Sequence, residues 1–169
     1  VKDHWGFGDP DAAGGTGFLR NVATTAICAE AIVSAPGYEI SAERQTAVAN
    51  ATVFLLNNGN STTYRCTAPP SGESVACQTE AWVSFPLQFL VRLQELDRVP
   101  AGLETQVAAR TEQLMDALLD CIAASPTQSL PRYYVTAPPD MRTWHSPFKV
   151  APALLALWRA ERFGARQPP

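Results

Sequence analysis

The sequence has no long apolar run and little charge of either sign. Of its 169 residues, 13 are Lys or Arg and 16 are Asp or Glu, which gives a formal net charge of -3. The two signs are mixed along the chain, so no basic stripe is available to neutralise a phosphate backbone. The longest near-continuous apolar stretch, 150–158, is interrupted by Pro152 and falls short of the roughly 18 residues that a bilayer-spanning helix needs. We therefore expect neither a nucleic-acid partner nor a transmembrane segment.

The motifs of several common catalytic centres are also missing. The sequence contains no G-x-S-x-G, no phosphate-binding P-loop, no H-E-x-x-H and no C-x-x-C. Its two His and four Cys show no zinc-ligand spacing. Asp9 and Asp11 form a D-x-D pattern in a Gly-rich N-terminal segment, 1–20, but the acidic residue at the twelfth position of a calcium loop is absent. We therefore expect no metal and no cofactor.

What the sequence does contain is an internal repeat. Three residues recur after 61 positions with their spacing intact, and a Trp-x-Ser element recurs after 62. The recurring residues are Glu43, Gln45 and Ala47 with Glu104, Gln106 and Ala108, and Trp82 and Ser84 with Trp144 and Ser146. A fixed period of this kind indicates a repeat architecture, in which one unit cannot bury its apolar face alone.

Apolar periodicity predicts about five helices. Their expected bounds are about 22–34, 41–57, 85–96, 103–123 and 147–163. The odd helices are apolar nearly all round and must be covered on every side, whereas the even helices have one polar face and can form an outer layer. Short connections make neighbouring helices antiparallel, so all odd helices should point the same way. The prediction is a single all-α domain, 1–169, of αα-hairpin repeats in two layers.

The four cysteines suggest two disulfides in an exported protein. Cys66 and Cys77 bracket a Pro/Gly/Ser-rich stretch within the segment 58–81, and a disulfide would stabilise such a loop. Cys28 and Cys121 fall in predicted helices and form the second expected pair. The alternative is four reduced, mostly buried thiols. Disulfides predict a secreted or periplasmic protein, and a chain that begins at Val1 fits a mature form or a fragment of a longer chain.

Several apolar helical stretches carry a resemblance to a known family. These stretches are 22–26, 53–56, 144–148 and 153–158. With the helix order and repeat length, they make the chain resemble the α/α-toroid repeats of the terpene cyclase and prenyltransferase superfamily, in which helical hairpins form two concentric rings. The chain lacks the D-x-D-D and Q-x-x-x-G-x-W motifs of that superfamily. The resemblance therefore implies a scaffold only: an open arc or partial toroid, part of a longer chain, or one protomer of an oligomer.

The segments that lead into the odd helices would gather along one edge, called here the rim. Helix N-termini at such a rim favour anions. Loops on a rigid helical frame often carry binding residues, and Trp, Tyr and Arg contribute most to binding energy. The candidate ligand-binding residues are Trp5, Trp82, Tyr133, Tyr134, Arg142 and Trp144.

His145 is the candidate for acid/base chemistry, with Asp140 close in sequence to orient it. A structural interpretation stands beside this one, in which His145 forms local hydrogen bonds near the start of the fifth helix. Trp82 and Trp144 likewise could be hydrophobic staples that pack from just outside a helix onto its first turns.

The sequence thus predicts a non-catalytic, exported helical repeat module that binds a protein partner or small-molecule ligand through the rim. The alternative is an α/α-toroid enzyme, or part of one, acting on an isoprenoid or carbohydrate substrate. Asp140, His145, Tyr133 and Tyr134 would then lie at the mouth of its pocket.

Overall fold

A computed structural model describes the backbone of residues 6–7, 19–20, 22–57, 64–67, 74–77, 81–123 and 147–164. Side chains are described for residues 22–57, 83–119 and 151–164.

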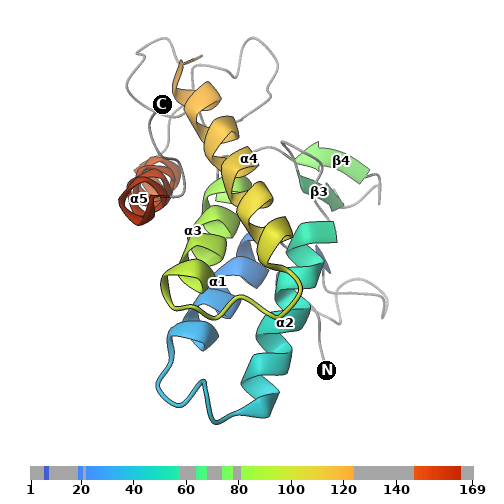
Figure 1. The fold of residues 1–169 in the computed structure, drawn as a ribbon. Helices are drawn as coiled ribbons and strands as arrows, with labels where there is room; N and C mark the ends of the chain where they lie inside the picture. The colour runs from blue at the N-terminus through green and yellow to red at the C-terminus, as the bar shows by residue number, and fades with distance from the viewer. Residues whose placement is uncertain are drawn as a thin grey trace, which may run out of the picture.

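Five helices form the described fold (Figure 1). They are α1 (Val22–Ser34), α2 (Ala42–Asn57), α3 (Ala81–Glu95), α4 (Glu104–Ala123) and α5 (Pro147–Phe163). Two short antiparallel strand pairs accompany them: β1 (Gly6–Phe7) with β2 (Leu19–Arg20), and β3 (Tyr64–Thr67) with β4 (Ser74–Cys77). The predicted all-α fold is confirmed, and α1 and α5 have the bounds expected from the sequence.

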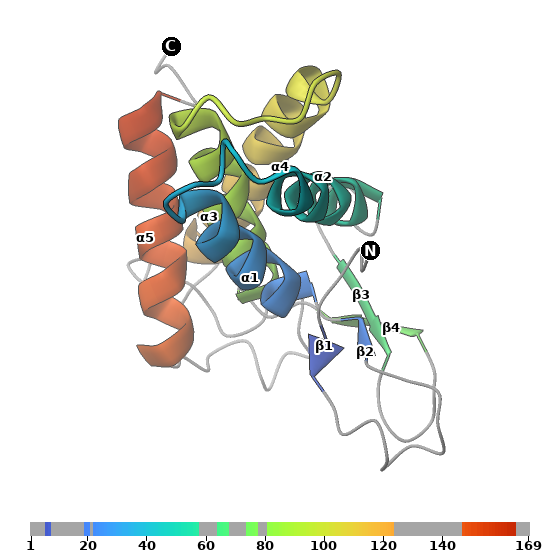
Figure 2. The ribbon, with the colours of Figure 1, turned by 90° about the horizontal axis from the view of Figure 1, so that it is seen from below.

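The helices lie in two layers, as predicted. The central helix α3 has α1 and α5 as its main neighbours in the inner row, while α2 packs on α1 and α4 packs on α3. In Figure 2 the chains of α1, α3 and α5 run in the same general direction. Each unit is therefore an αα-hairpin whose apolar inner helix is stabilised by the next inner helix and by its own outer partner.

Helix α3 is the core of the molecule. Every residue from Pro86 to Val91 is buried, and Leu93, two residues later, has no exposed surface. On the other side of the α3–α5 contact, the buried residues of α5 are small: Ala153, Ala156 and Ala160. Small side chains allow the two helix backbones to approach closely. Two polar contacts fix the position of α5: Gln88 Nε2 donates to the Pro152 carbonyl at 3.0 Å, and Arg159 pairs with Glu30 of α1 at 2.5 Å.

The two outer helices bury the same pattern of side chains. Each presents a Val, a Thr and a Leu at positions i, i+4 and i+7, and each Thr Oγ1 donates at 2.8 Å to the carbonyl of that Val. The residues are Val48, Thr52 and Leu55 in α2 and Val107, Thr111 and Leu114 in α4. This packing pattern recurs after 59 residues, two fewer than the 61-residue period of the first turns, so the two outer helices share a similar buried face in a register shifted by two residues.

Helix α3 begins earlier than the sequence predicted. Its first residue is Ala81, about one turn before the expected start near residue 85. Pro86 is the sixth residue of α3, and its missing N–H costs one hydrogen bond, to the carbonyl of residue 82 in the first turn. Trp82 is thus inside the helix, and the expectation that it packs from outside as a hydrophobic staple is wrong.

The expected Cys28–Cys121 disulfide is also wrong. Cys28 is a free cysteine, because α1 packs mainly against α3 and α2, whereas α4 packs mainly against α3 and α5. Burial raises the pKa of the Cys28 thiol, which keeps it in the unreactive protonated form. Cys66 and Cys77 lie in β3 and β4, opposite Val75 and Tyr64 respectively. Their side chains are outside the described residues, so a bond between them remains a prediction.

We expect two free thiols, Cys28 and Cys121, in the denatured but unreduced protein, because Cys66 and Cys77 should be bonded. That bond should stabilise the protein by about 2 to 3 kcal/mol by restricting the unfolded chain. Thiol titration in denaturant, with and without reductant, measures both states. Four free thiols before reduction would contradict the Cys66–Cys77 bond and remove the argument that the protein is exported. No free thiols before reduction would contradict the free state of Cys28.

Candidate functional site

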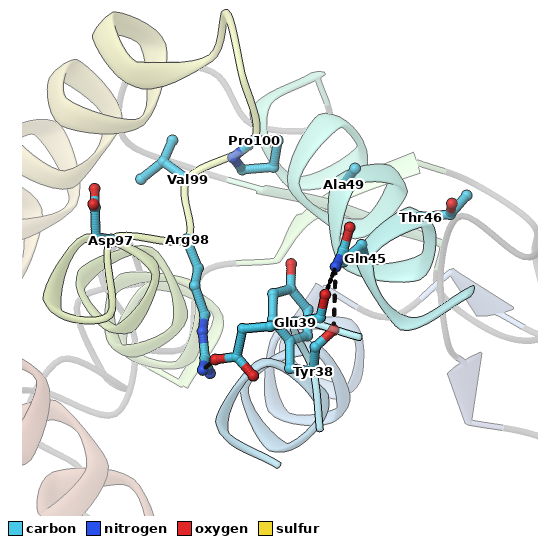
Figure 3. Close-up of a pocket in the computed structure, with 9 residues that line it drawn as sticks. All are labelled: Tyr38, Glu39, Gln45, Thr46, Ala49, Asp97, Arg98, Val99 and Pro100. Carbon is cyan, nitrogen blue, oxygen red and sulfur yellow. Dashed lines mark hydrogen bonds and ion pairs between the residues drawn. The ribbon is translucent and has the colours of Figure 1, made fainter. Parts of the chain in front are cut away.

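A pocket of about 470 Å³ lies between the turn that joins α1 to α2 and the turn that joins α3 to α4 (Figure 3). Its polar lining residues include Tyr38, Glu39 and Gln45 from the first hairpin, and Asp97 and Arg98 from the second. The pocket is at the C-terminal ends of α1 and α3, so it lies at the opposite end of the hairpins from the expected rim.

The backbone conformation at the C-terminal end of α3 determines the direction of the Arg98 side chain. Asp97 adopts a left-handed backbone conformation with φ of 53°. The Asp97 N–H donates to the Gln94 carbonyl at 3.1 Å, and the Arg98 N–H donates to the Leu93 carbonyl at 2.8 Å. This pair of bonds is the Schellman arrangement that commonly terminates a helix. It turns the chain sharply and directs Arg98 toward the first hairpin.

The Arg98 side chain joins the two hairpins. Its guanidinium forms an ion pair with Glu39, donates a hydrogen bond to the Val33 carbonyl, and lies 4.9 Å from the centre of the Tyr38 ring. Figure 3 shows Arg98 reaching across to Glu39. The Arg98 guanidinium therefore binds a carboxylate, a carbonyl in the last turn of α1 and the face of an aromatic ring at the same time.

Gln45, one of the repeated residues, completes the pocket. Its Nε2 donates to the carbonyls of Tyr38 at 3.3 Å and Glu39 at 2.7 Å, which fixes the turn before α2. The side chains of Arg98 and Gln45 are therefore committed to contacts within the protein. This arrangement is that of a structural clamp between two repeats, which we call the Arg98 clamp.

We expect Arg98→Met to lower the free energy of unfolding by about 1 to 2 kcal/mol, because Met keeps the apolar stem but removes the charge-assisted hydrogen bonds. Urea denaturation measures the change. Arg44→Met is the matched control, since the side chain of exposed Arg44 donates at 2.7 Å to the Pro36 carbonyl of its own hairpin, and the loss of this bond should cost about 0.5 kcal/mol or less. Equal effects of the two substitutions would contradict the clamp.

Tyr38 should make stability fall at alkaline pH. Burial raises the pKa of the Tyr38 hydroxyl, and the positive charge of Arg98 only partly lowers it. Because the folded state favours the neutral phenol, the contribution to stability is complete below the ordinary tyrosine pKa of about 10 and is lost as the pH rises through the folded-state value. Urea midpoints measured across this range should fall less steeply in Tyr38→Phe than in the native protein. Identical slopes in the two proteins would show that a group other than Tyr38 causes the loss of stability at alkaline pH.

The second surface is an apolar stripe on α5. On the face opposite its buried alanines, Leu154 and Leu155 are each 41% exposed and Trp158 is 53% exposed. Exposed Ala151 precedes them, and the guanidinium of Arg162 lies 5.3 Å from the centre of the Trp158 ring. We call these five residues the α5 stripe. The expectation that α5 is covered on every side is therefore wrong, because the alanine face alone is buried against its neighbours.

Most of the predicted site residues are outside the described part of the chain. For Trp82 the backbone position in α3 is known, and nothing is described of its side chain. The remaining candidates outside the described residues are Trp5, Tyr133, Tyr134, Asp140, Arg142, Trp144 and His145. The predicted rim site and the roles of His145 and Asp140 therefore remain predictions.

Neither the Arg98 clamp nor the α5 stripe is among the site residues predicted from the sequence. Tyr38 and Arg98 are far apart in sequence, and no local motif marks them as partners. The α5 stripe is a second apolar face of the predicted helix 147–163, and a helix that is apolar nearly all round is expected to be buried on that face as well. Its spacing at i, i+3, i+4 and i+7 was the available signal.

Within the described residues, no group of three or more His, Cys, Asp or Glu side chains is placed to hold a metal ion. In the same part of the chain, no helix has the length and apolar character needed to cross a bilayer. No family model, curated protein or solved structure matches this chain. The resemblance to α/α-toroid repeats stays a prediction.

Proposed function

We propose that this chain is a non-catalytic helical repeat module that binds a protein partner, with the α5 stripe as part of its binding surface. The observation that carries the proposal is the exposure of Leu154, Leu155 and Trp158 along one face of a helix. Large apolar side chains grouped in this way are typical of interaction surfaces.

The composition and support of the stripe favour a protein partner. Trp and Arg are the residue types most enriched among those that dominate binding energy, and here Arg162 stacks on Trp158. The stripe lies on a helix held by α3 through its alanine face and by the Arg159–Glu30 ion pair. A surface that is rigid before binding loses little conformational entropy when the partner arrives.

The proposed binding surface also includes the rim. The shared direction of α1, α3 and α5 supports the expectation that the segments leading into these helices approach the same side of the molecule (Figure 2). Tyr133, Tyr134, Arg142 and Trp144 would then extend the binding surface near the N-terminus of α5. Location in a secreted or periplasmic compartment also remains part of the proposal, and it depends on the Cys66–Cys77 bond.

The Arg98 clamp supports a structural role for the pocket. Arg98 and Gln45, which could otherwise bind a ligand, donate instead to Glu39 and to backbone carbonyls of Val33, Tyr38 and Glu39. A ligand that accepts hydrogen bonds in this pocket would have to compete with these internal contacts. A partner that binds the leucines of the α5 stripe does not have to displace internal hydrogen bonds of this kind.

We expect a photoreactive phenylalanine derivative at position 155 to form a discrete protein adduct in an extract of the source cells, because Leu155 lies in the proposed surface. The same group at Val53 on α2 is the matched control, since Val53 is 42% exposed and lies away from the stripe. Denaturing gels and mass spectrometry identify the adduct. Leu154→Glu should abolish it by placing a charge in an apolar contact.

A Tyr134→Ala, His145→Ala variant tests the rim in the same experiment. A lower adduct yield, with the fold unchanged by circular dichroism, would support a surface that includes both regions. Equal adducts at positions 53 and 155, or no adduct at 155, would contradict the proposed function.

A further inference from the structure

The pocket between the two hairpin turns has a buried aromatic floor. Tyr38 is 7% exposed, whereas the lining residues Glu39, Gln45 and Asp97 are exposed around it. Figure 3 shows the Tyr38 hydroxyl pointing into the space between Gln45 and Pro100. Within the described residues this hydroxyl has no hydrogen-bond partner, since the Tyr38 side chain contacts Arg98 only through its ring. A hydroxyl held so deeply without a partner is costly unless a molecule in the pocket completes its hydrogen bonds.

The donor side chains around this hydroxyl are already in use. The guanidinium of Arg98 and the amide nitrogen of Gln45 donate to groups within the Arg98 clamp. Thr46 Oγ1 donates to the Ala42 carbonyl at 2.8 Å. A ligand that needs donors would therefore have to break the contacts that hold the two hairpins.

The polar groups that the clamp leaves unused are acceptors. Among the described residues, the amide oxygen of Gln45, the Asp97 carboxylate and one carboxylate oxygen of Glu39 take no hydrogen bond. The Tyr38 hydroxyl oxygen can also accept. Two carboxylates and one guanidinium give the lining a net charge of -1. The pocket is therefore suited to a ligand that donates hydrogen bonds and carries a positive charge.

A primary ammonium group has this chemistry, because it offers three donors and no acceptor. The lining contains two carboxylates and no His or Cys, which favours an ammonium over a transition-metal ion. The apolar lining residues Ala49, Val99 and Pro100 can contact an aliphatic stem. The volume of about 470 Å³ is within the range of small-ligand sites.

We propose that this pocket binds a primary ammonium group on a short aliphatic stem, with Tyr38, Gln45 and Asp97 as its binding residues. The ammonium belongs either to a free amine or to a lysine side chain of another protein, since both present the same group. The site is separate from the α5 stripe, and the inference does not rest on the proposed function.

Titration of the full chain with butylammonium chloride tests the proposal. Amide chemical shifts measured by NMR should change saturably at positions 38–39, 45–49 and 97–99, which belong to the pocket or flank it. The expected Kd is about 1 to 10 mM, a range suited to so small a ligand. Butanol and butyrate, at the same ionic strength, have the same stem without the positive charge. Both should bind about fivefold more weakly or not at all.

Two conservative variants locate the ammonium. Tyr38→Phe keeps the ring on Arg98 and removes the hydroxyl, so it should weaken butylammonium binding about fivefold without lowering the urea midpoint at neutral pH. Asp97→Asn removes a charge, and Asn readily adopts the left-handed backbone found there, so binding should weaken about threefold. Glu112→Gln is the matched control, because it removes an exposed carboxylate of α4 that does not line the pocket.

A blocked lysine, Nα-acetyl-lysine methylamide, distinguishes the two sources. Binding tighter than that of butylammonium would assign the pocket to a lysine side chain of a partner, and weaker binding would assign it to a free amine. Equal affinity for butylammonium and butanol would overturn the proposal, because the charge would then play no part. Unchanged affinity in both Tyr38→Phe and Asp97→Asn would also overturn it, as would the absence of saturable shifts up to about 100 mM.

Discussion

The burial of α3 is the constraint on which the rest of the structure depends. A helix that is apolar on all sides is stable in water only when other elements cover all of those sides. In this chain α1, α4 and α5 provide that cover, and α2 in turn packs on α1. The two layers follow from this requirement, because outer helices with one polar face can surround α3 without needing cover themselves.

Much of the fold could be predicted because its signals are local. Pro36 and Gly37 follow the end of α1, and Ser146 and Pro147 stand at the start of α5, so the sequence itself carries a stop signal and a start signal at these two ends. Apolar periodicity distinguishes inner from outer helices. The predicted start of α3, near residue 85, is about one turn too late, because the helix begins at Ala81 and includes Pro86 as its sixth residue. An even number of cysteines does not determine their pairing. The Cys28–Cys121 prediction failed because α1 and α4 are not principal neighbours.

The site was less predictable because its contacts are not local. The Arg98 clamp joins two turns that only the finished packing of α1 against α3 brings together, and Arg98 reaches its partners because Asp97 adopts a left-handed conformation. The α5 stripe shows a different limit. Periodicity identifies which residues share a face, but it does not say whether a neighbour covers that face. Leu155 and Ala156 are adjacent and both apolar, yet the first is exposed and the second buried.

The two ends of the hairpins have different physical roles. At one end Arg98 holds successive hairpins together, which fixes the spacing between α1 and α3, while Gln45 fixes the turn of the first hairpin. In a repeat protein each unit is stabilised mainly by its neighbours, and units whose outer faces are polar act as caps that end the array. The outer face of α5, with Trp158 and two leucines, lacks that polar character. The exposed apolar face of α5 therefore resembles the inner face of a repeat more than a cap, and a partner that covers Leu154, Leu155 and Trp158 would remove this face from water.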